Sequence, residues 1–521
     1  MSAGAVRRPN GVLATYIHTI RYLKPLQVYG RISSWVPRAP RSRPAPPVRA
    51  RTGRLVLFAP RRKSRTGPFR FRFLNSEREP GGWNEPGIPR LWLYNLHYFD
   101  EPEGALIRKW IRENERIEGA GWEPYPTSLR IVNWVKWLLS EGGNPECEAS
   151  LARQTRHLKL HLEYRLLANH LLANAKALIF SGLFFCGKEA EGWLEAGLRI
   201  LNREIPEQIL PDGAHFERSP MYHSIILEDL LDLVNLARAY PGCVPDRVVE
   251  NWRETAGRML GWLLRMCHPD GEISFFNDAA FGIAPPPREL SAYASRLGLR
   301  ARFEPFSSGY LRLEIGDAVC LFDAAPIGPD YQPGHAHSDT LSFELSSQGR
   351  RLIVNSGTST YEESAQRSSE RSTPAHNTIA IDGLDQSELW GAFRCARRAR
   401  PFDVRFEQLG DCVRAEARHD GYRRLSNPVI HRRSMRLAPG LLEIHDCLEG
   451  TGFHKADIYF HLHPEAGRDG IGIPRLDPKF RAAMEHSTWR PEFGRCVPNT
   501  SIVGSWSGRC PVEFTSYVPL G

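Results

Sequence analysis

The hydrophobic periodicity of the chain changes once, near residue 300. Before this point, apolar residues recur at helical spacing in segments of about one to two dozen residues joined by short connections. These segments are 127–139, 149–167, 171–185, 193–204, 219–239 and 248–267. After about Tyr310, short strand-like runs such as 311–315, 352–354, 378–381 and 457–463 are separated by Gly, Pro and Asp-Gly turns. The sequence therefore predicts an α+β multidomain protein, with a helical domain followed by a large antiparallel β-sandwich.

Two loops in the helical region resemble one another. One begins Pro211-Asp212-Gly213 and the other Pro269-Asp270-Gly271. Asp-Gly favours a tight turn with positive φ, so we expect both loops to fold alike on one rim. A repeated helix pair with a shared rim loop favours an incomplete α/α toroid over an irregular bundle. The predicted boundaries are 1–89 for an N-terminal arm, 90–300 for the toroid and 305–521 for the sandwich.

The N-terminal arm differs from the rest in composition. Segment 37–70 is rich in Pro and Arg, which is typical of a linker. Leu13, Tyr16, Ile20 and Leu23 predict a short amphipathic helix stopped by Pro25, and we expect it to pack on the protein rather than to anchor a membrane. No apolar run approaches the roughly 18–20 residues of a transmembrane segment. No signal peptide is visible in residues 1–54, so the sequence predicts a cytoplasmic protein.

The formal net charge of +9 favours an anionic partner. Basic residues are dispersed apart from 38–65 and 394–400, and no known nucleic-acid-binding module surrounds them. An acidic polymer is therefore favoured over nucleic acid. The ten cysteines lack C-x-x-C pairs, which predicts reduced, buried thiols and no cysteine-built zinc site. The sequence does not indicate an oligomeric state.

Two polar motifs interrupt the helical region. Asn169 and His170 open an apolar helix, where an interior pair bonded to a neighbouring helix is the alternative to a functional role. Further on, Ser219 is predicted to cap a helix whose first residue is Pro220. Tyr222 would then lie in the first turn, where the helix dipole favours an anionic side chain and so a proton-carrying phenol. The alternative is a packing tyrosine with a solvated hydroxyl.

His335-x-His337-x-Asp339 is the strongest chemical signal in the β-region. On a strand, these three side chains would share a face with the apolar residues that follow them. Polar groups on an apolar face need partners, a metal or a catalytic role. Two imidazoles at H-x-H spacing can reach one point, and Asp339, Asn355 or His376 is a candidate third metal ligand.

The order of these motifs resembles the heparinase II/III family of polysaccharide lyases, whose members join an α/α toroid to a β-sandwich. The matching pieces, in chain order, are Asn169-His170, Ser219-Pro220-Met221-Tyr222-His223, His335-x-His337-x-Asp339, Asn355-Ser356-Gly357-Thr358 with Tyr361, and Arg371-Ser372-Thr373-Pro374-Ala375-His376-Asn377. The resemblance runs from residue 92 to the C-terminus and is most specific within 334–386. It does not explain the first ninety or so residues. It also implies the periplasm or cell envelope as an alternative location.

This resemblance implies a role for each catalytic candidate. Asn169 and His170 would hold the uronate carboxylate of the substrate. Tyr222 would carry a proton on the toroid side, with His335 as the opposing base. Tyr361 matches a tyrosine found near the site in some relatives.

The resemblance also bears on cofactors. His337 and His376 match histidines that hold a structural zinc ion in some relatives. The third ligand there is usually an aspartate, but this chain has Asn355, and a neutral amide is a poorer zinc ligand. The sequence therefore slightly favours a protein without zinc, and no organic cofactor is expected.

These residue types suit β-elimination of a uronate-containing acidic polysaccharide. Amide and imidazole donors neutralise the carboxylate beside C5, a base removes the C5 proton, and a Tyr or His protonates the leaving oxygen. The residues predicted to bind substrate are Arg218, His223 and Arg371. One alternative is a uronyl hydrolase, which would use two carboxylates among Glu217, Asp278 and Asp339. The other is a non-catalytic polysaccharide-binding or assembly factor.

Overall fold

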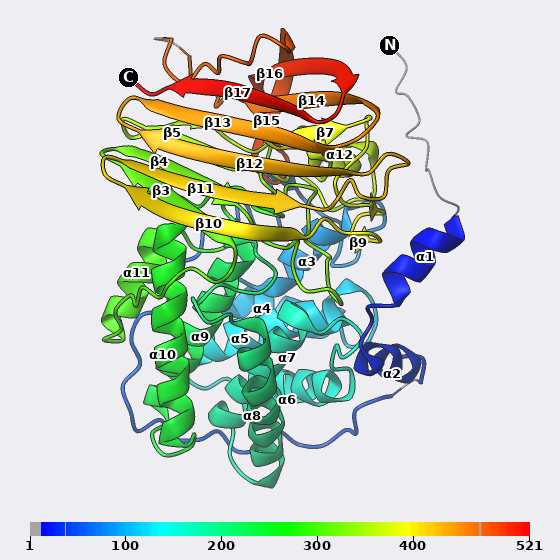
Figure 1. Ribbon diagram of the computed structural model, residues 1–521. Helices are drawn as coiled ribbons and strands as arrows, with labels where there is room; N and C mark the ends of the chain where they lie inside the picture. The colour runs from blue at the N-terminus through cyan, green and yellow to red at the C-terminus, as the bar shows by residue number, and fades with distance from the viewer. Residues whose placement is uncertain (1–11, 37, 468–469) are drawn as a thin grey trace.

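The computed structural model describes residues 12–36, 38–467 and 470–521. Helices form one half of the molecule and stacked sheets the other, with the sheets above the helices in Figure 1. The helices are α1 (Val12–Ile20), α2 (Pro25–Ser33), α3 (Arg90–Tyr98), α4 (Gly104–Glu113), α5 (Pro124–Glu141), α6 (Pro145–Leu160), α7 (Ala168–Phe184), α8 (Lys188–Gln208), α9 (Pro220–Ala239), α10 (Asp246–Arg265), α11 (Pro287–Arg296) and α12 (Ala365–Glu370), with 3-10 turns at Ala120–Trp122 and Thr373–Ala375. The predicted order, a helical region followed by a β-region, is confirmed.

The strands form three main antiparallel sheets and two small ones. They are β1 (Phe71–Phe73), β2 (Ser76–Arg78), β3 (Tyr310–Ile315), β4 (Ala318–Asp323), β5 (Phe343–Ser347), β6 (Arg350–Ile353), β7 (Ile379–Ile381), β8 (Leu389–Trp390), β9 (Arg394–Cys395), β10 (Pro401–Leu409), β11 (Cys412–His419), β12 (Val429–Ala438), β13 (Leu441–Gly450), β14 (Phe453–His461), β15 (Arg481–Glu492), β16 (Arg495–Arg509) and β17 (Val512–Pro519). The main sheets run β10-β11-β12-β13-β17, β15-β16-β14-β7 and β3-β4-β5-β6. Apolar side chains such as Phe343, Met435 and Ile458 are fully buried between them.

Helices α7 and α9 carry the polar motifs of the toroid. The Ser219 side chain accepts a hydrogen bond from the Tyr222 backbone amide at 3.1 Å, and Pro220 is the first residue of α9. The predicted cap is therefore confirmed, and Tyr222 lies in the first turn. Helix α7 packs closely on α8. A Cβ added at Gly182 of α7 would lie 2.6 Å from the Leu194 backbone nitrogen of α8, so this close approach requires glycine.

The two Asp-Gly loops fold alike, as predicted. Each closes a short antiparallel bridge, Ile209 with His215 in the first loop and Cys267 with Ile273 in the second. Gly213 and Gly271 have φ of 92° and 82°. Both turns need this left-handed conformation, which glycine adopts without a steric cost.

The strand predicted through His335 and His337 begins only at Phe343. The two histidines lie in a loop that bonds to residues 277–278, and pairing with β4 begins only at Leu341, whose amide donates to the Asp323 carbonyl at 2.7 Å. The His337 amide donates to Asn277 Oδ1 at 2.9 Å, and Asp278 donates from its own amide to the His335 carbonyl at 3.0 Å. Leu341, with φ of 63°, marks the turn into β5. Residue parity was therefore the wrong guide to where these histidines point.

The Pro- and Arg-rich arm runs along the outside of the helices (Figure 1). Its backbone bonds to their ends: the Arg49 amide donates to the Phe184 carbonyl at 2.8 Å and the Gly53 amide to the Ala239 carbonyl at 3.0 Å. Pro37 and residues 1–11, which belong to the predicted arm, lie outside the described residues. All ten cysteines, each within the described ranges, are free thiols. Among the described helices, none is both long and apolar enough to cross a membrane.

Candidate active site

A cleft of about 1380 Å³ lies between the helices and the β-region. All five residues predicted to be catalytic line its wall: Asn169, His170 and Tyr222 from the helices, and His335 and Tyr361 from the β-region. Aromatic side chains suited to stacking on sugar rings also line it, namely Tyr94, Tyr98, Tyr125, Tyr331, Trp390 and Phe393. The two halves of the molecule thus contribute to one site.

Tyr222, Tyr361 and His335 form a compact group. The ring of Tyr222 stacks on that of His335, with centroids 3.8 Å apart and an interplanar angle of 26°. The Tyr222 and Tyr361 hydroxyls lie 3.1 Å apart, at hydrogen-bonding distance. Burial, together with Tyr361, raises the pKa of Tyr222 well above its ordinary value. Tyr222 is therefore a neutral phenol at neutral pH.

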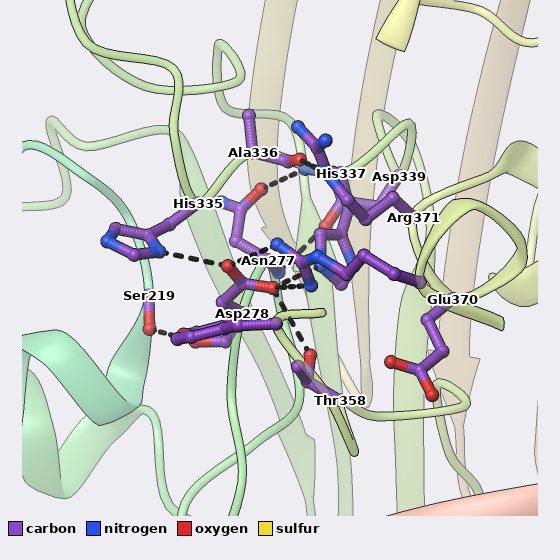
Figure 2. A network of polar contacts seen from close by, with 12 residues as sticks. Ser219, Asn277, Asp278, His335, Ala336, His337, Asp339, Thr358, Glu370 and Arg371 are labelled. Atoms are coloured by element: carbon purple, nitrogen blue, oxygen red, sulfur yellow. Dashed lines mark hydrogen bonds and ion pairs between the residues drawn. The ribbon is translucent and has the colours of Figure 1, made fainter. Parts of the chain in front are cut away.

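Asp278 is the centre of the polar network (Figure 2). Its carboxylate oxygens lie 2.9 Å from His335 Nδ1 and 2.8 Å from His337 Nε2, and both also accept hydrogen bonds from Arg367. Burial alone would raise the pKa of Asp278, but Arg367 and the two histidines outweigh it and hold the pKa well below its usual range. Sequence reasoning weighed Asp278 only as a hydrolytic carboxylate and missed this role.

The hydrogen bond to Asp278 fixes the orientation of His335. A carboxylate only accepts hydrogen bonds, so Nδ1 carries the proton and Nε2 carries the lone pair in the neutral ring. Nε2 lies 3.5 Å from Glu217 Oε2. The available nitrogen of His335 is thus the one that a base would use.

Glu217 is an unusual neighbour for His335. It is 2% exposed, and its polar neighbours include His335 and the backbone of Asn169. Burial raises the pKa of Glu217, although His335 opposes the shift. The amide oxygen of nearby Asn169 is buried without a partner. Asn169 lines the cleft, so its amide oxygen is placed to accept a hydrogen bond from a ligand there.

His170 is held by a second carboxylate. Its Nδ1 lies 3.1 Å from Glu163 Oε1, and its ring packs against Tyr125 at 4.6 Å between centroids. Burial would lower the pKa of His170, but Glu163 outweighs burial and raises it. A more cationic His170 is a better partner for an anionic group. The exposed Arg165, which sequence reasoning also missed, lines the cleft on the same segment.

Backbone strain accompanies these residues. Ala168, Arg218 and Asn277 adopt left-handed φ values of 49°, 56° and 55°. Each directly adjoins a site residue, respectively Asn169, Glu217 and Asp278. Such conformations cost on the order of 1–3 kcal/mol each and cluster at functional sites.

His337 and His376 form a pair close to His335, on the other side of Asp278. His337 donates from Nε2 to Asp278 and His376 from Nδ1 to the Ser372 carbonyl at 2.8 Å, so their facing nitrogens, 3.1 Å apart, both carry lone pairs. Burial lowers the pKa of His337 to about 4 and that of His376 to about 3, which keeps both rings neutral. This pair fits a zinc ion, which binds neutral imidazole at about 2.0–2.1 Å.

Asn355 is the remaining ligand candidate. Its Nδ2 donates to the Phe275 carbonyl at 2.9 Å, and its Oδ1 accepts two longer hydrogen bonds of 3.3 Å from Asn377. In the part of the chain that the structure describes, no group of three His, Cys, Asp or Glu is arranged to hold a metal. A zinc site here would therefore depend on the amide.

The three residues predicted to bind substrate form hydrogen bonds to backbone groups of the protein. His223 is fully buried, with Nε2 donating to the Met259 carbonyl at 2.8 Å and Nδ1 accepting from the His215 amide. Arg218 donates from Nε to the Ser308 carbonyl at 3.0 Å, which joins α9 to the start of the β-region. Arg371, 1% exposed, donates to the Ala336 carbonyl and so holds the H-x-H loop. Each of the three thus donates to a backbone carbonyl and none lines the cleft, so substrate binding by these residues stays a prediction.

The fold and the cleft define a two-domain protein of the toroid-plus-sandwich class that includes polysaccharide lyases. Sequence models described as "Heparinase II/III N-terminus" and "Heparinase II/III-like, C-terminal" match residues 147–285 and 300–495, together more than half of the chain. The chain belongs to the heparinase II/III family. The crystal structure of heparinase III superposes with a TM-score of 0.64 at 18% identity, covering 83% of this chain and 76% of that one, which supports the fold.

Two curated relatives point in different directions. A heparin-sulfate lyase of Bacteroides stercoris is 27% identical over 317 residues, which are 53% of this chain and 46% of that protein. The match therefore spans less than half of that lyase. The FtsZ-localized protein C of Caulobacter vibrioides is 27% identical over 437 residues, covering 74% of this chain and 72% of that protein.

Proposed function

We propose that this protein is a polysaccharide lyase that cleaves a uronate-containing acidic polysaccharide by β-elimination. The observation that carries the proposal is the meeting of Asn169, Tyr222 and His335 in one cleft, from opposite halves of the molecule. Neither half holds a carboxylate-binding amide, a base and an acid together. Relatives named heparin-sulfate lyases support the same class of reaction.

The mechanism follows from the hydrogen-bonding partners. Asn169 and His170 bind the uronate carboxylate and stabilise the charge that develops when the C5 proton leaves. His335, oriented by Asp278 through Nδ1, accepts this proton on Nε2. Tyr222, a neutral phenol bonded to Tyr361, donates a proton to the leaving glycosidic oxygen. Each positioned acid or base contributes roughly 10²–10⁴-fold to the rate.

The hydrolase alternative is less well supported. Asp278 is fully buried beneath two histidines and Arg367. The Asp339 carboxylate accepts the Asn277 amide at 3.0 Å and is 1% exposed. Only Glu217 borders the base, whereas hydrolysis needs two carboxyl groups flanking the bond.

A structural zinc ion is part of the proposal. His337 Nδ1 and His376 Nε2 would hold it, with the Asn355 amide oxygen as a weaker third ligand. When bound, it would join the H-x-H loop to the loop that carries His376 and so stabilise the position of His335. None of the proton transfers above passes through it.

A non-catalytic polysaccharide-binding or assembly role is the second candidate. The likeness to FtsZ-localized protein C, which covers nearly three quarters of both chains, favours it. Such a protein would retain the cleft and bind polymer without cleaving it.

One experiment separates these functions. The protein is incubated with heparan-type, alginate-type and bacterial uronate polymers, and ultraviolet absorbance from a C4–C5 double bond is followed. A lyase gives absorbance, which Tyr222→Phe should lower about 10²–10⁴-fold with binding retained. Tyr331 also lines the cleft, and its hydroxyl donates to Glu207. Tyr331→Phe removes this hydroxyl and keeps the ring, so it is the matched control and should keep its activity. Reducing ends without absorbance would indicate a hydrolase, and binding without products would indicate the non-catalytic role.

A further inference from the structure

Helices α1 and α2 present apolar side chains away from the protein. Leu13, Ile17, Val28, Tyr29, Ile32 and Trp35, here called the N-terminal patch, are between 47% and 75% exposed. Twenty large apolar side chains are exposed among the described residues, and nine of them lie within 13–36. Exposure is therefore concentrated in residues 13–36. The two helices of this segment lie at one edge of the molecule (Figure 1).

Polar residues hold the inner side of the same helices. Thr19 accepts a hydrogen bond from Trp390 Nε1 at 3.0 Å, and Gln27 donates to the Tyr331 carbonyl at 3.1 Å. Gly30 approaches so closely that an added Cβ would lie 2.5 Å from the Arg165 backbone nitrogen. Helix α1 packs on the protein, as predicted, but it leaves Leu13 and Ile17 exposed. These contacts fix the helices so that the side chains of the N-terminal patch face away from the protein. A concentrated exposed apolar surface marks an interaction site.

The chain around the patch is strongly basic. Residues 1–76 contain 17 Lys and Arg, and the first acidic residue is Glu77. The charge of +17 on residues 1–76 exceeds the net charge of +9 of the whole chain, so residues 77–521 carry a net negative charge. Arg21, Arg38 and Arg41 are exposed within or just after the two helices. Any surface that covers the patch also meets positive charge.

We propose that the N-terminal patch docks this protein on an anionic lipid surface. Amphipathic helices with apolar and basic side chains lie in the plane of the membrane interface, with Trp and Tyr at the level of the headgroups. Basic residues nearby are attracted to anionic lipids. Since Ile20 and Gln27 of the same helices line the cleft, docking holds the cleft beside the membrane. No residue of the patch lines the cleft, so docking is separable from catalysis.

The test measures sedimentation of the full-length protein with vesicles. Phosphatidylcholine vesicles with and without phosphatidylglycerol are compared. The variant Ile17→Asp with Trp35→Asp should lose at least tenfold in partitioning to the anionic vesicles. The control Phe453→Asp with Met484→Asp alters side chains of similar exposure (66% and 69%) in the β-region and should bind like wild type. Arg38→Gln and Arg41→Gln should each weaken binding about fivefold.

Several outcomes would overturn the docking proposal. Wild type that binds neither type of vesicle, or patch and control variants that bind alike, would remove its basis. Equal binding to neutral vesicles would refute the anionic preference. A dimer in solution that the patch variant dissociates would assign the patch to a second copy of the chain. Cleavage of a soluble polymer should be equal for all these proteins, so loss of docking and failure of the lyase proposal are distinguishable.

Discussion

Replacing Asp278 by asparagine removes one negative charge from the centre of the site while preserving shape. Arg367, whose side chain is fully buried, would lose the carboxylate that compensates it. His335 would lose the acceptor that fixes its proton on Nδ1, because an amide can also donate to that nitrogen. The substitution should therefore affect both stability and catalysis.

The two effects differ in size and origin. Breaking a buried ion pair on one side costs about 3–5 kcal/mol, because the remaining charge has no counter-ion. For a chain of this length, such a loss lowers the Tm by about 3–5 °C. A misoriented base should lower kcat by about 10²–10⁴-fold. This corresponds to roughly 3–5 kcal/mol of the activation barrier.

The chain supplies a matched control in Asp446. This buried aspartate accepts from Arg433 at 2.8 and 3.1 Å and lies 2.7 Å from His431, in the sandwich. Asp446→Asn should therefore lower the free energy of unfolding by a similar amount while the folded fraction keeps its kcat. Denaturant unfolding and initial rates of absorbance, measured on the same preparations, provide both quantities. The reasoning fails if Asp278→Asn keeps wild-type kcat, or if both variants lose activity equally.

Two further predictions concern the neighbours of the base. Glu217 has a raised pKa in the folded protein, so the folded state binds its proton more tightly than the unfolded state does. Wild type should therefore lose up to about 1.4 kcal/mol of stability per pH unit as the pH rises from the ordinary glutamate pKa through the raised one. Glu217→Gln should not show this loss. Thermal melts from pH 4 to pH 8 should show the variant gaining on wild type as pH rises, and parallel curves would contradict the raised pKa. Wild-type protein loaded with zinc and then dialysed should retain about one ion per chain by elemental analysis. His376→Ala should retain less than about a tenth as much zinc. Asn355→Asp should bind zinc more tightly than wild type, because a carboxylate is a better ligand than an amide. Equal metal in wild type and His376→Ala would remove the proposed site.

The sequence predicted the architecture because periodicity and turn chemistry are local signals. The helical spacing before residue 300, the Ser219 cap and the two Asp-Gly loops depend on near neighbours. Contacts distant in sequence were less readable. Asp278 lies 57 residues from His335, and no pattern joins an isolated aspartate to a histidine in a later loop.

One prediction was wrong for a physical reason. His335 and His337 do converge, but on Asp278 from a loop rather than from one face of a strand. Arg218, His223 and Arg371 are polar residues in functional motifs, and each donates to a backbone carbonyl that the sequence does not reveal. Sequence indicates which residues are polar but not which buried partner each one meets.

The N-terminal arm has a consequence for assembly of the fold. Its amides bond to the carbonyls of Phe184 and Ala239, the last residues of α7 and α9. Helix ends leave such carbonyls without partners inside the helix. The arm therefore supplies, from outside the helical domain, partners for the ends of two helices that lie far along the chain, and it links those two ends to one another.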